Sequence, residues 1–240
     1  MTDAHCHVSC GDSPVRELLV GRDFFGVHPW ETLDDGTIGT GGTTETRRAL
    51  VPDIPVVPDV SSLAALLATL RSQLLANPAA GVGEIGLDRL KSRDISPRMR
   101  EVFEAQLALA LELGRPVVLH GAKCWGQVVA AVKVQGAEAS GTRFLFHGFS
   151  RSDGLIPEIV KLNGFISVGP AVLNDHAVNY RELVKKIPLD RLLVETDRTS
   201  SSDSPSISDV LAKTADILNL SASELERITD ENADRFLGAV

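Results

Sequence analysis

The chain has 240 residues, 43% hydrophobic and 23% charged, which is ample apolar material for one large core. A net charge of −8 argues against a protein that clamps long duplex DNA by charge alone, but not against a single phosphate-ester site, where bound cations would invert the local charge. The chain has only three cysteines, which argues against a disulfide scaffold. It shows no basic or apolar leader segment and no apolar run of about 20 residues, which argues against a membrane protein. A cytoplasmic protein is therefore expected.

Short apolar segments bounded by Gly, Pro or charged residues predict buried parallel strands. Seven segments have this character: residues 3–7, 24–28, 80–84, 116–120, 143–147, 165–168 and 192–195. Apolar residues at the 3.6-residue period predict helices over residues 63–76, 100–113, 125–134, 155–162, 179–187, 207–218 and 222–237. Asp175 is expected near a helix start, and Ser221 with Glu224 is expected to form a capping box. The Gly- and Thr-rich residues 33–46 predict an irregular loop.

The alternation of strands and helices continues without a linker, which favours one α/β barrel over residues 1–240 rather than two domains. The alternative fold is an open doubly wound sheet. No glycine-rich phosphate loop follows the first predicted strand, and this absence disfavours the open sheet.

Five of the six histidines stand at or just past the end of a predicted strand. In a parallel barrel, this end of the strands forms the rim on which active sites are built. The sixth, His176, follows Asn174 and Asp175 in a region predicted as helical, and no functional role is expected for it.

The first strand predicts a metal site. Side chains alternate along a strand, so His5 and His7 share one face, and two imidazoles on one face can bind one cation. Cys6 points the other way and is not expected to be a ligand. Glu84 ends an apolar strand, where a carboxylate needs a charged partner, and it can bridge two ions. Asp88 is expected to bind an arginine or a helix N-terminus.

Three more polar residues end later strands. His120 and His147 occupy equivalent places on consecutive strands, and Asp197 follows the last strand. Asp197 can ligate a metal and orient or deprotonate an attacking water. Glu195 shares the strand parity of Asp197 and is expected to support the metal ligands through hydrogen bonds. His28 remains for a substrate contact or a supporting hydrogen bond. The structural alternatives are core histidines and a buried salt bridge at Glu84.

Two carboxylates and four imidazoles exceed the needs of one tetrahedral zinc ion. Two ions that share Glu84 would use the whole set, with one ion on His5, His7 and Asp197 and the other on His120 and His147. The residues do not decide between Zn, Mg, Mn and Ni, or between one ion and two. A two-ion site suits hydrolysis of a phosphate ester.

Eight segments occur together in a fixed order: DAHCH, GVHPW, GEIGLD, RPVVLH, FHGFS, FISVG, LLVETD and NADRFLG. In this ordered set the sequence resembles the TatD family of metal-dependent deoxyribonucleases, within the amidohydrolase-like barrels. The resemblance implies a distorted TIM-barrel-like (β/α)8 fold and phosphodiester hydrolysis. It carries the family's metal positions over to His5, His7, Glu84, His120, His147 and Asp197, and a further histidine position to His28.

The sequence departs from the family pattern in three places. Positions 8 and 24 lie too close together for the usual extra strand and helix, so one βα unit near the N-terminus is expected to be shortened or missing. Ala122 stands where the family has a basic residue, and Lys123 is the expected substitute for contact with the substrate. Arg198 and a run of serines follow Asp197, and Arg198 and Arg89 are further candidate cations at the rim.

The leading expectation is therefore a metal-dependent nuclease or phosphodiesterase that acts on DNA ends or short single strands. The first rival is a hydrolase of another small substrate, such as a phosphomonoester, lactone or amide. The second is a metal-bound binding protein without activity. No membrane association and no obligate protein partner are expected.

Overall fold

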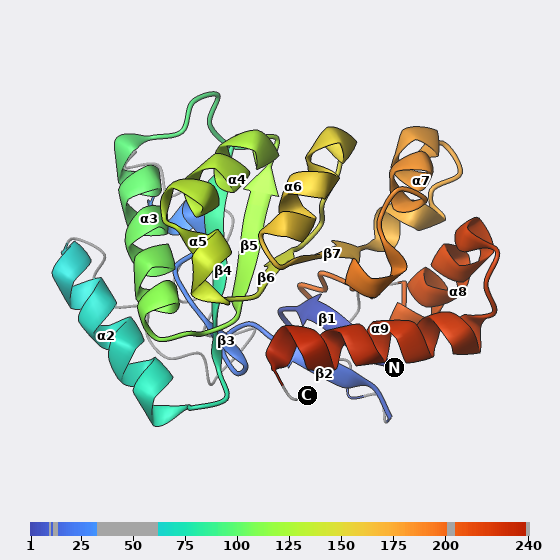
Figure 1. The fold of residues 1–240 in the computed structure, drawn as a ribbon, viewed down its shortest axis with the longest axis horizontal. Coiled ribbons are helices and arrows are strands. Elements are labelled where there is room, and N and C mark those ends of the chain that lie inside the picture. Colours follow the sequence, from blue (N-terminus) through green and yellow to red (C-terminus); the bar gives the residue numbers. More distant parts are fainter. Residues whose placement is uncertain (10, 12–13, 33–61, 201–204, 239–240) are drawn as a thin grey trace.

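The structure, a computed structural model, describes residues 1–9, 11, 14–32, 62–200 and 205–238 (Figure 1). The loop predicted over residues 33–46 lies outside the described residues, as does Cys10. None of the described helices combines the length and apolar character needed to cross a membrane.

Parallel strands form the centre of the molecule. They are β1 (Thr2–Cys6), β2 (Arg16–Leu19), β3 (Phe24–Phe25), β4 (Gly81–Asp88), β5 (Val117–Ala122), β6 (Phe144–Phe146), β7 (Gly164–Val168) and β8 (Leu192–Val194). One sheet pairs β1 with β2, and the other runs in the order β3-β4-β5-β6-β7-β8. Two seams join the sheets, because Val20 bridges to Phe24 and the N–H of Asp197 donates to the carbonyl of His5 at 3.0 Å. The strands thus follow one another around a barrel-like arrangement.

Helices flank the strands (Figure 1). The α-helices are α2 (Leu63–Ala76), α3 (Pro97–Glu112), α4 (Trp125–Val134), α5 (Ala137–Ser140), α6 (Ile156–Lys161), α7 (Val178–Val184), α8 (Ile207–Leu218) and α9 (Ala222–Leu237). Short 3-10 helices lie at η1 (Pro29–Thr32), η2 (Asp153–Leu155), η3 (Pro170–Leu173) and η4 (Leu189–Arg191).

Helix starts follow the capping side chains. Ser96 accepts the N–H of Met99, so α3 begins three residues before its predicted start. Ser221 caps α9 by accepting the N–H of Glu224, as predicted, but the complete reciprocal capping box belongs to α8. Asp175 lies near the start of α7, as predicted, but Ala177 is the N-cap residue and the Asp175 carboxylate pairs with Arg181 at 2.8 Å.

The shortened N-terminal unit has a specific form. The sequence predicted seven strands, and β2 is the eighth, so the strand itself is present. What is shortened is the chain between strands: residues 7–15 connect β1 to β2 and residues 20–23 connect β2 to β3, and the described part of both connections contains no helix. These residues are too few for a helical crossover of about a dozen residues.

The core consists of three clusters of buried apolar side chains, the smallest of which is formed by Val27, Leu66 and Val102. A large outer layer fills the space between strands and helices. A smaller cluster gathers one residue from each of seven strands together with two residues of α9: Ala4, Leu18, Phe24, Val118, Leu145, Phe165, Leu193, Ala233 and Phe236. The two-residue period of a strand places His120 on the face of Val118 and His147 on the face of Leu145. The same strands therefore present apolar side chains at one end of the barrel and imidazoles at the other.

Candidate metal centre

Six strands and the residues that directly follow them bring the predicted site residues together, with Glu84 inside β4 rather than at its predicted end. The side chains form three overlapping groups that could hold a metal ion, and the ligand atoms within each group lie within 4.8 Å of one another. The groups are His5, Glu84 and His147; His5, His7 and Asp197; and His28, Glu84 and His120. All six predicted metal ligands and the predicted supporting histidine thus converge on one place.

Glu84 is the hub of this cluster, and its carboxylate is almost fully buried. Its Oε1 atom lies 2.5 Å from Nδ1 of His120 and 2.6 Å from Nε2 of His147. Its Oε2 atom lies 3.4 Å from Nε2 of both His5 and His7. The two oxygens therefore face two different pairs of imidazoles, which is the division expected of a carboxylate shared between two ions.

Electrostatics favour the ionised form of Glu84. Burial, the largest single influence, raises the pKa of this carboxyl, but the imidazoles of His147 and His120 together lower it well below its usual range. An ionised carboxylate that is buried among several imidazoles is a strong attractor for cations.

Asp197 completes the side of the cluster formed by His5 and His7. Its Oδ1 atom lies 3.6 Å from Nε2 of His5 and 3.5 Å from Nε2 of His7. Its backbone is in the left-handed region, with φ 50°, a conformation that aspartate tolerates better than most residues. The side chain is 48% exposed, so this carboxylate is the part of the cluster most open to an incoming molecule.

The cluster fits divalent cations by the chemistry of its donors. Both ring nitrogens of His5 and Nδ1 of His147 are buried without a hydrogen-bond partner among the described residues. Leaving such polar atoms unsatisfied is costly. Neutral imidazole nitrogens with carboxylate oxygens are the donor set of Zn, Mn, Fe and Ni sites, so bound metal would satisfy atoms that the protein leaves unpaired.

A second set of carboxylates orients the imidazoles. Nε2 of His120 donates to Oδ2 of Asp88 at 2.7 Å, so the predicted pairing of Asp88 with an arginine or a helix terminus was wrong. Glu195 accepts the N–H of Gly148 at 2.7 Å and the hydroxyl of Ser167, and its Oε1 atom lies 3.7 Å from Nδ1 of His147. Outer partners of this kind fix the ring orientation of metal ligands.

Asp3 is a supporting residue that the sequence reasoning missed. Its carboxylate accepts the N–H of Thr196 at 2.9 Å and the Thr196 hydroxyl at 2.6 Å. Burial raises the pKa of this carboxyl to about 6, although the bonds from Thr196 lower it. These contacts tie β1 to the segment that carries Asp197. The sequence signal was available, because Asp3 shares strand parity with His5.

His28 lies at the edge of the cluster, with Nε2 3.6 Å from Oε1 of Glu84. Its Nδ1 atom accepts the N–H of Trp30 at 3.1 Å, so in the neutral ring the proton is on Nε2. Burial lowers the pKa of His28 despite its contact with Glu84, which favours this neutral form. A ring that directs an N–H toward the cluster suits a hydrogen-bond donor better than a metal ligand.

The candidate cations differ in their placement. Lys123 is exposed on a left-handed turn with φ 59°, and it does not line the cavity that opens beside Asp197. Arg89 donates from Nε to the carbonyl of Arg93 at 2.9 Å. Arg198 is buried rather than free at the rim, and its carbonyl accepts the N–H of His7 at 2.9 Å.

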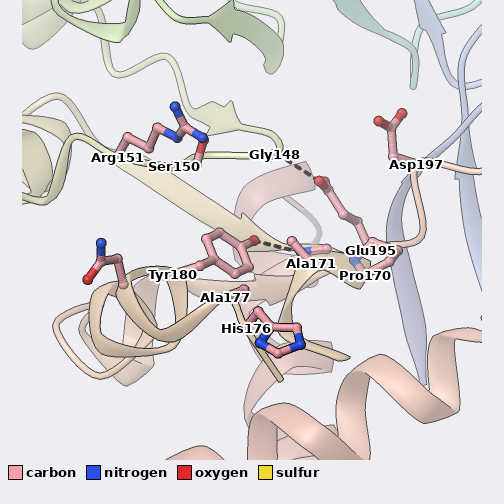
Figure 2. A pocket seen from close by; sticks show the side chains of 12 residues that line it. Gly148, Ser150, Arg151, Pro170, Ala171, His176, Ala177, Tyr180, Glu195 and Asp197 are labelled. Atoms are coloured by element: carbon pink, nitrogen blue, oxygen red, sulfur yellow. Dashed lines mark hydrogen bonds between the residues drawn. The ribbon is translucent and has the colours of Figure 1, made fainter. Parts of the chain in front are cut away.

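A cavity of about 740 Å³ opens beside Asp197 (Figure 2). Its lining is formed by Gly148, Ser150, Arg151, Gly169, Pro170, Ala171, His176, Ala177, Asn179, Tyr180, Glu195 and Asp197. Two of these side chains were not anticipated from the sequence. Arg151 was not singled out, and His176 lies on an exposed turn before α7, not inside a helix as predicted. Nothing in the local sequence shows that these two loops meet beside the last strand.

Comparison with known proteins identifies the family. The profile of the family described as TatD related DNase matches residues 22–238. The chain is 32% identical over 179 residues to YabD of Bacillus subtilis, described as an uncharacterized metal-dependent hydrolase, and the match covers 71% of this chain and 69% of that protein. The first strand, with His5 and His7, precedes the region matched by the family profile.

Other relatives match over shorter stretches. The chain is 31% identical over 126 residues to a protein of Edwardsiella piscicida described as 3'-5' ssDNA/RNA exonuclease TatD. This match covers 52% of this chain and 48% of that protein. The chain therefore spans about half the length of this exonuclease. The crystal structure of YjjV, a TatD homologue from Escherichia coli, superimposes with a TM-score of 0.65 over 94% of this chain and 78% of the other, at 23% identity. That likeness supports the barrel-like fold.

Proposed function

Because this chain belongs to the TatD family of metal-dependent hydrolases, we propose that it hydrolyses phosphodiester bonds in short or single-stranded DNA. The observation that carries the proposal is the position of Glu84, whose two oxygens face separate pairs of imidazoles beside an open cavity. Relatives described as ssDNA/RNA exonucleases support the choice of substrate.

In this proposal, His5, His7 and Asp197 would hold one ion and His120 and His147 the other, and Glu84 would be a ligand common to both. Bound divalent ions supply Lewis acidity, which makes water a stronger nucleophile at neutral pH and stabilises negative charge on phosphate oxygens. The remaining chemistry belongs to the protein's own side chains.

Asp197 is the proposed proton acceptor. Its carboxylate is the most exposed of the cluster and lines the cavity, so it can orient the attacking water and accept its proton. His28 is the proposed substrate contact, because its Nε2–H can donate to a phosphate oxygen. Asp88 and Glu195 hold the imidazoles of His120 and His147 in place throughout.

The charge of the chain sets the preferred length of the substrate. With a net charge of −8, the surface adds little favourable attraction to a long polyanion. Few phosphates would be neutralised, so affinity for DNA would arise mainly at the rim of the barrel. We expect short single strands to be favoured over long duplexes, with a high KM. A cytoplasmic location remains a prediction of the sequence.

The test is a panel of reactions with each of Zn, Mn, Mg and Ni. The substrates are a single-stranded oligonucleotide, plasmid DNA, a phosphomonoester and a lactone, and Glu84→Gln serves as the inactive control. We expect the wild-type protein to cleave the oligonucleotide and the Glu84→Gln variant not to cleave it. Activity on the lactone only would assign the site to a hydrolase of another small substrate. Inactivity on every substrate at full metal occupancy would indicate a binding protein.

A further inference from the structure

Arg151 is an uncompensated cation in the cavity beside the metal centre. It is the only lysine or arginine among the described residues that line this cavity. No ion pair or hydrogen bond of its side chain occurs within the described part of the chain, and the side chain is exposed. Its backbone is in the left-handed region, with φ 59°, a conformation that is unfavourable for arginine.

The acidic residues of the same cavity do not neutralise Arg151. Glu195 is buried and is occupied by Gly148, Ser167 and the ring of His147. Asp197 faces the imidazoles of His5 and His7. Since both carboxylates are committed to the metal centre, the charge of Arg151 is available to an anionic group of a ligand.

The cavity has a fixed ring on its wall. The Tyr180 hydroxyl accepts the N–H of Gly169 at 3.1 Å, and this bond holds the aromatic ring in position. In Figure 2, Arg151 lies above Tyr180 and His176 below it, while Asp197 lies at the upper right. The volume of about 740 Å³ is within the range of about 300–1,000 Å³ typical of small-ligand pockets. The cavity therefore has room for a nucleoside between Arg151 and Asp197.

We propose that Arg151 binds a second phosphate of the substrate, adjacent to the phosphate that is cleaved, with the intervening nucleoside in the cavity against Tyr180. The guanidinium fork suits this role because it can bind phosphate oxygens through two parallel hydrogen bonds. The enzyme is then selective for substrates with two neighbouring phosphates over an isolated phosphodiester. This inference rests on the proposed phosphodiesterase function and specifies its substrate.

The test compares substrates that differ by one phosphate. The dinucleotide TpT has a single phosphodiester, and its 5'-phosphorylated and 3'-phosphorylated forms carry a second phosphate on one side or the other. We expect Arg151→Gln to raise KM for one phosphorylated form about tenfold, the effect of losing a charge-assisted hydrogen bond. The variant should leave kcat within about twofold and kcat/KM for TpT unchanged. Arg151→Lys, which keeps the charge without the fork, should recover part of the loss.

Three matched variants control for charge. Arg89→Gln and Lys123→Gln remove other cations expected near the rim, and Arg227→Gln removes an exposed cation that pairs with Glu231 on α9. None of them should alter the preference for the second phosphate. If Arg89→Gln or Lys123→Gln removes it while Arg151→Gln does not, the second-phosphate site lies elsewhere and the inference is wrong.

A binding measurement separates this inference from the proposed function. Calorimetry compares thymidine 3',5'-bisphosphate with thymidine 5'-monophosphate and thymidine 3'-monophosphate on the metal-loaded protein. Tighter binding of the bisphosphate, lost in Arg151→Gln, supports the second-phosphate site whether or not any substrate is cleaved. Equal binding of the three ligands, or an advantage that survives Arg151→Gln, overturns it. Absence of hydrolysis with every metal would instead overturn the phosphodiesterase function.

Discussion

Asp88 accepts a hydrogen bond from Nε2 of His120 at 2.7 Å, and the other ring nitrogen of His120, Nδ1, faces Oε1 of Glu84 at 2.5 Å. The pairing fixes which nitrogen is available to a metal ion, because a neutral imidazole donates from one nitrogen and binds through the other. It also gives Asp88, which is fully buried, a role that its place in the sequence did not reveal.

Asp88→Ala should weaken metal binding about 10–100-fold, the effect typical of losing a partner that orients a metal-bound histidine. The affected ion is the one assigned to His120 and His147. Metal titration by calorimetry measures the loss, and Asp94→Ala, which removes an exposed carboxylate a few residues away, is the control. Equal affinities of the Asp88 variant and the wild type would show that His120 is not a ligand.

Glu84→Gln should reduce activity more than His28→Ala does. The carboxylate is positioned to contact both ions, whereas His28 is placed to donate a single hydrogen bond. We expect Glu84→Gln to lower the metal content of the purified protein as well, and His28→Ala to keep it. Elemental analysis together with steady-state kinetics decides the order, and the reverse ranking would place the shared ligand elsewhere.

Metal binding at pH 7 should release at least one proton. Burial, the largest influence, lowers the pKa of His7, but hydrogen bonds with Asp197 and Glu84 raise it to about 9 in the metal-free protein. A raised histidine pKa means that the proton stabilises the metal-free fold fully below about pH 6.5, and that this stabilisation is lost as the pH rises through about 9. A metal ion needs the neutral ring and competes with that proton.

Metal affinity should therefore rise between pH 7 and pH 9, by up to about tenfold per unit for each proton released. Calorimetry at one pH in buffers of different ionisation enthalpy counts the protons. His7→Ala should release fewer protons than the wild type. Proton release that is zero at pH 7 in the wild-type protein would contradict the raised pKa of His7.

Phe236→Ala should destabilise the fold without changing the metal centre. The Phe236 ring is fully buried and lies 5.8 Å from the ring of Phe24 and 5.9 Å from that of Phe165, between centroids. Truncating such a ring costs about 3–5 kcal/mol. Denaturant unfolding measures the loss, and metal stoichiometry under native conditions should stay that of the wild type. A stability within about 1 kcal/mol of the wild type would show that α9 is not part of the barrel core.

The sequence by itself determined the strands that carry the imidazoles and the end of the barrel at which they meet. Residues two apart on a strand share a face, so His120 and His147 follow from the apolar strands that precede them. Parallel strands also place their carboxyl ends at one rim, so the convergence of Glu84, His120 and His147 was predictable without coordinates.

The tertiary structure decided the pairings between strands and the lining of the cavity. Asp88 contacts His120 because β4 continues beyond its predicted end and pairs with β5 through Asp88 and Ala122. Arg151 and His176 line one cavity because the loops after β6 and β7 approach each other beside Asp197. Loop conformation is not encoded by a short repeating pattern of apolar residues, and contacts between segments far apart in the chain exist only once the barrel has placed them together.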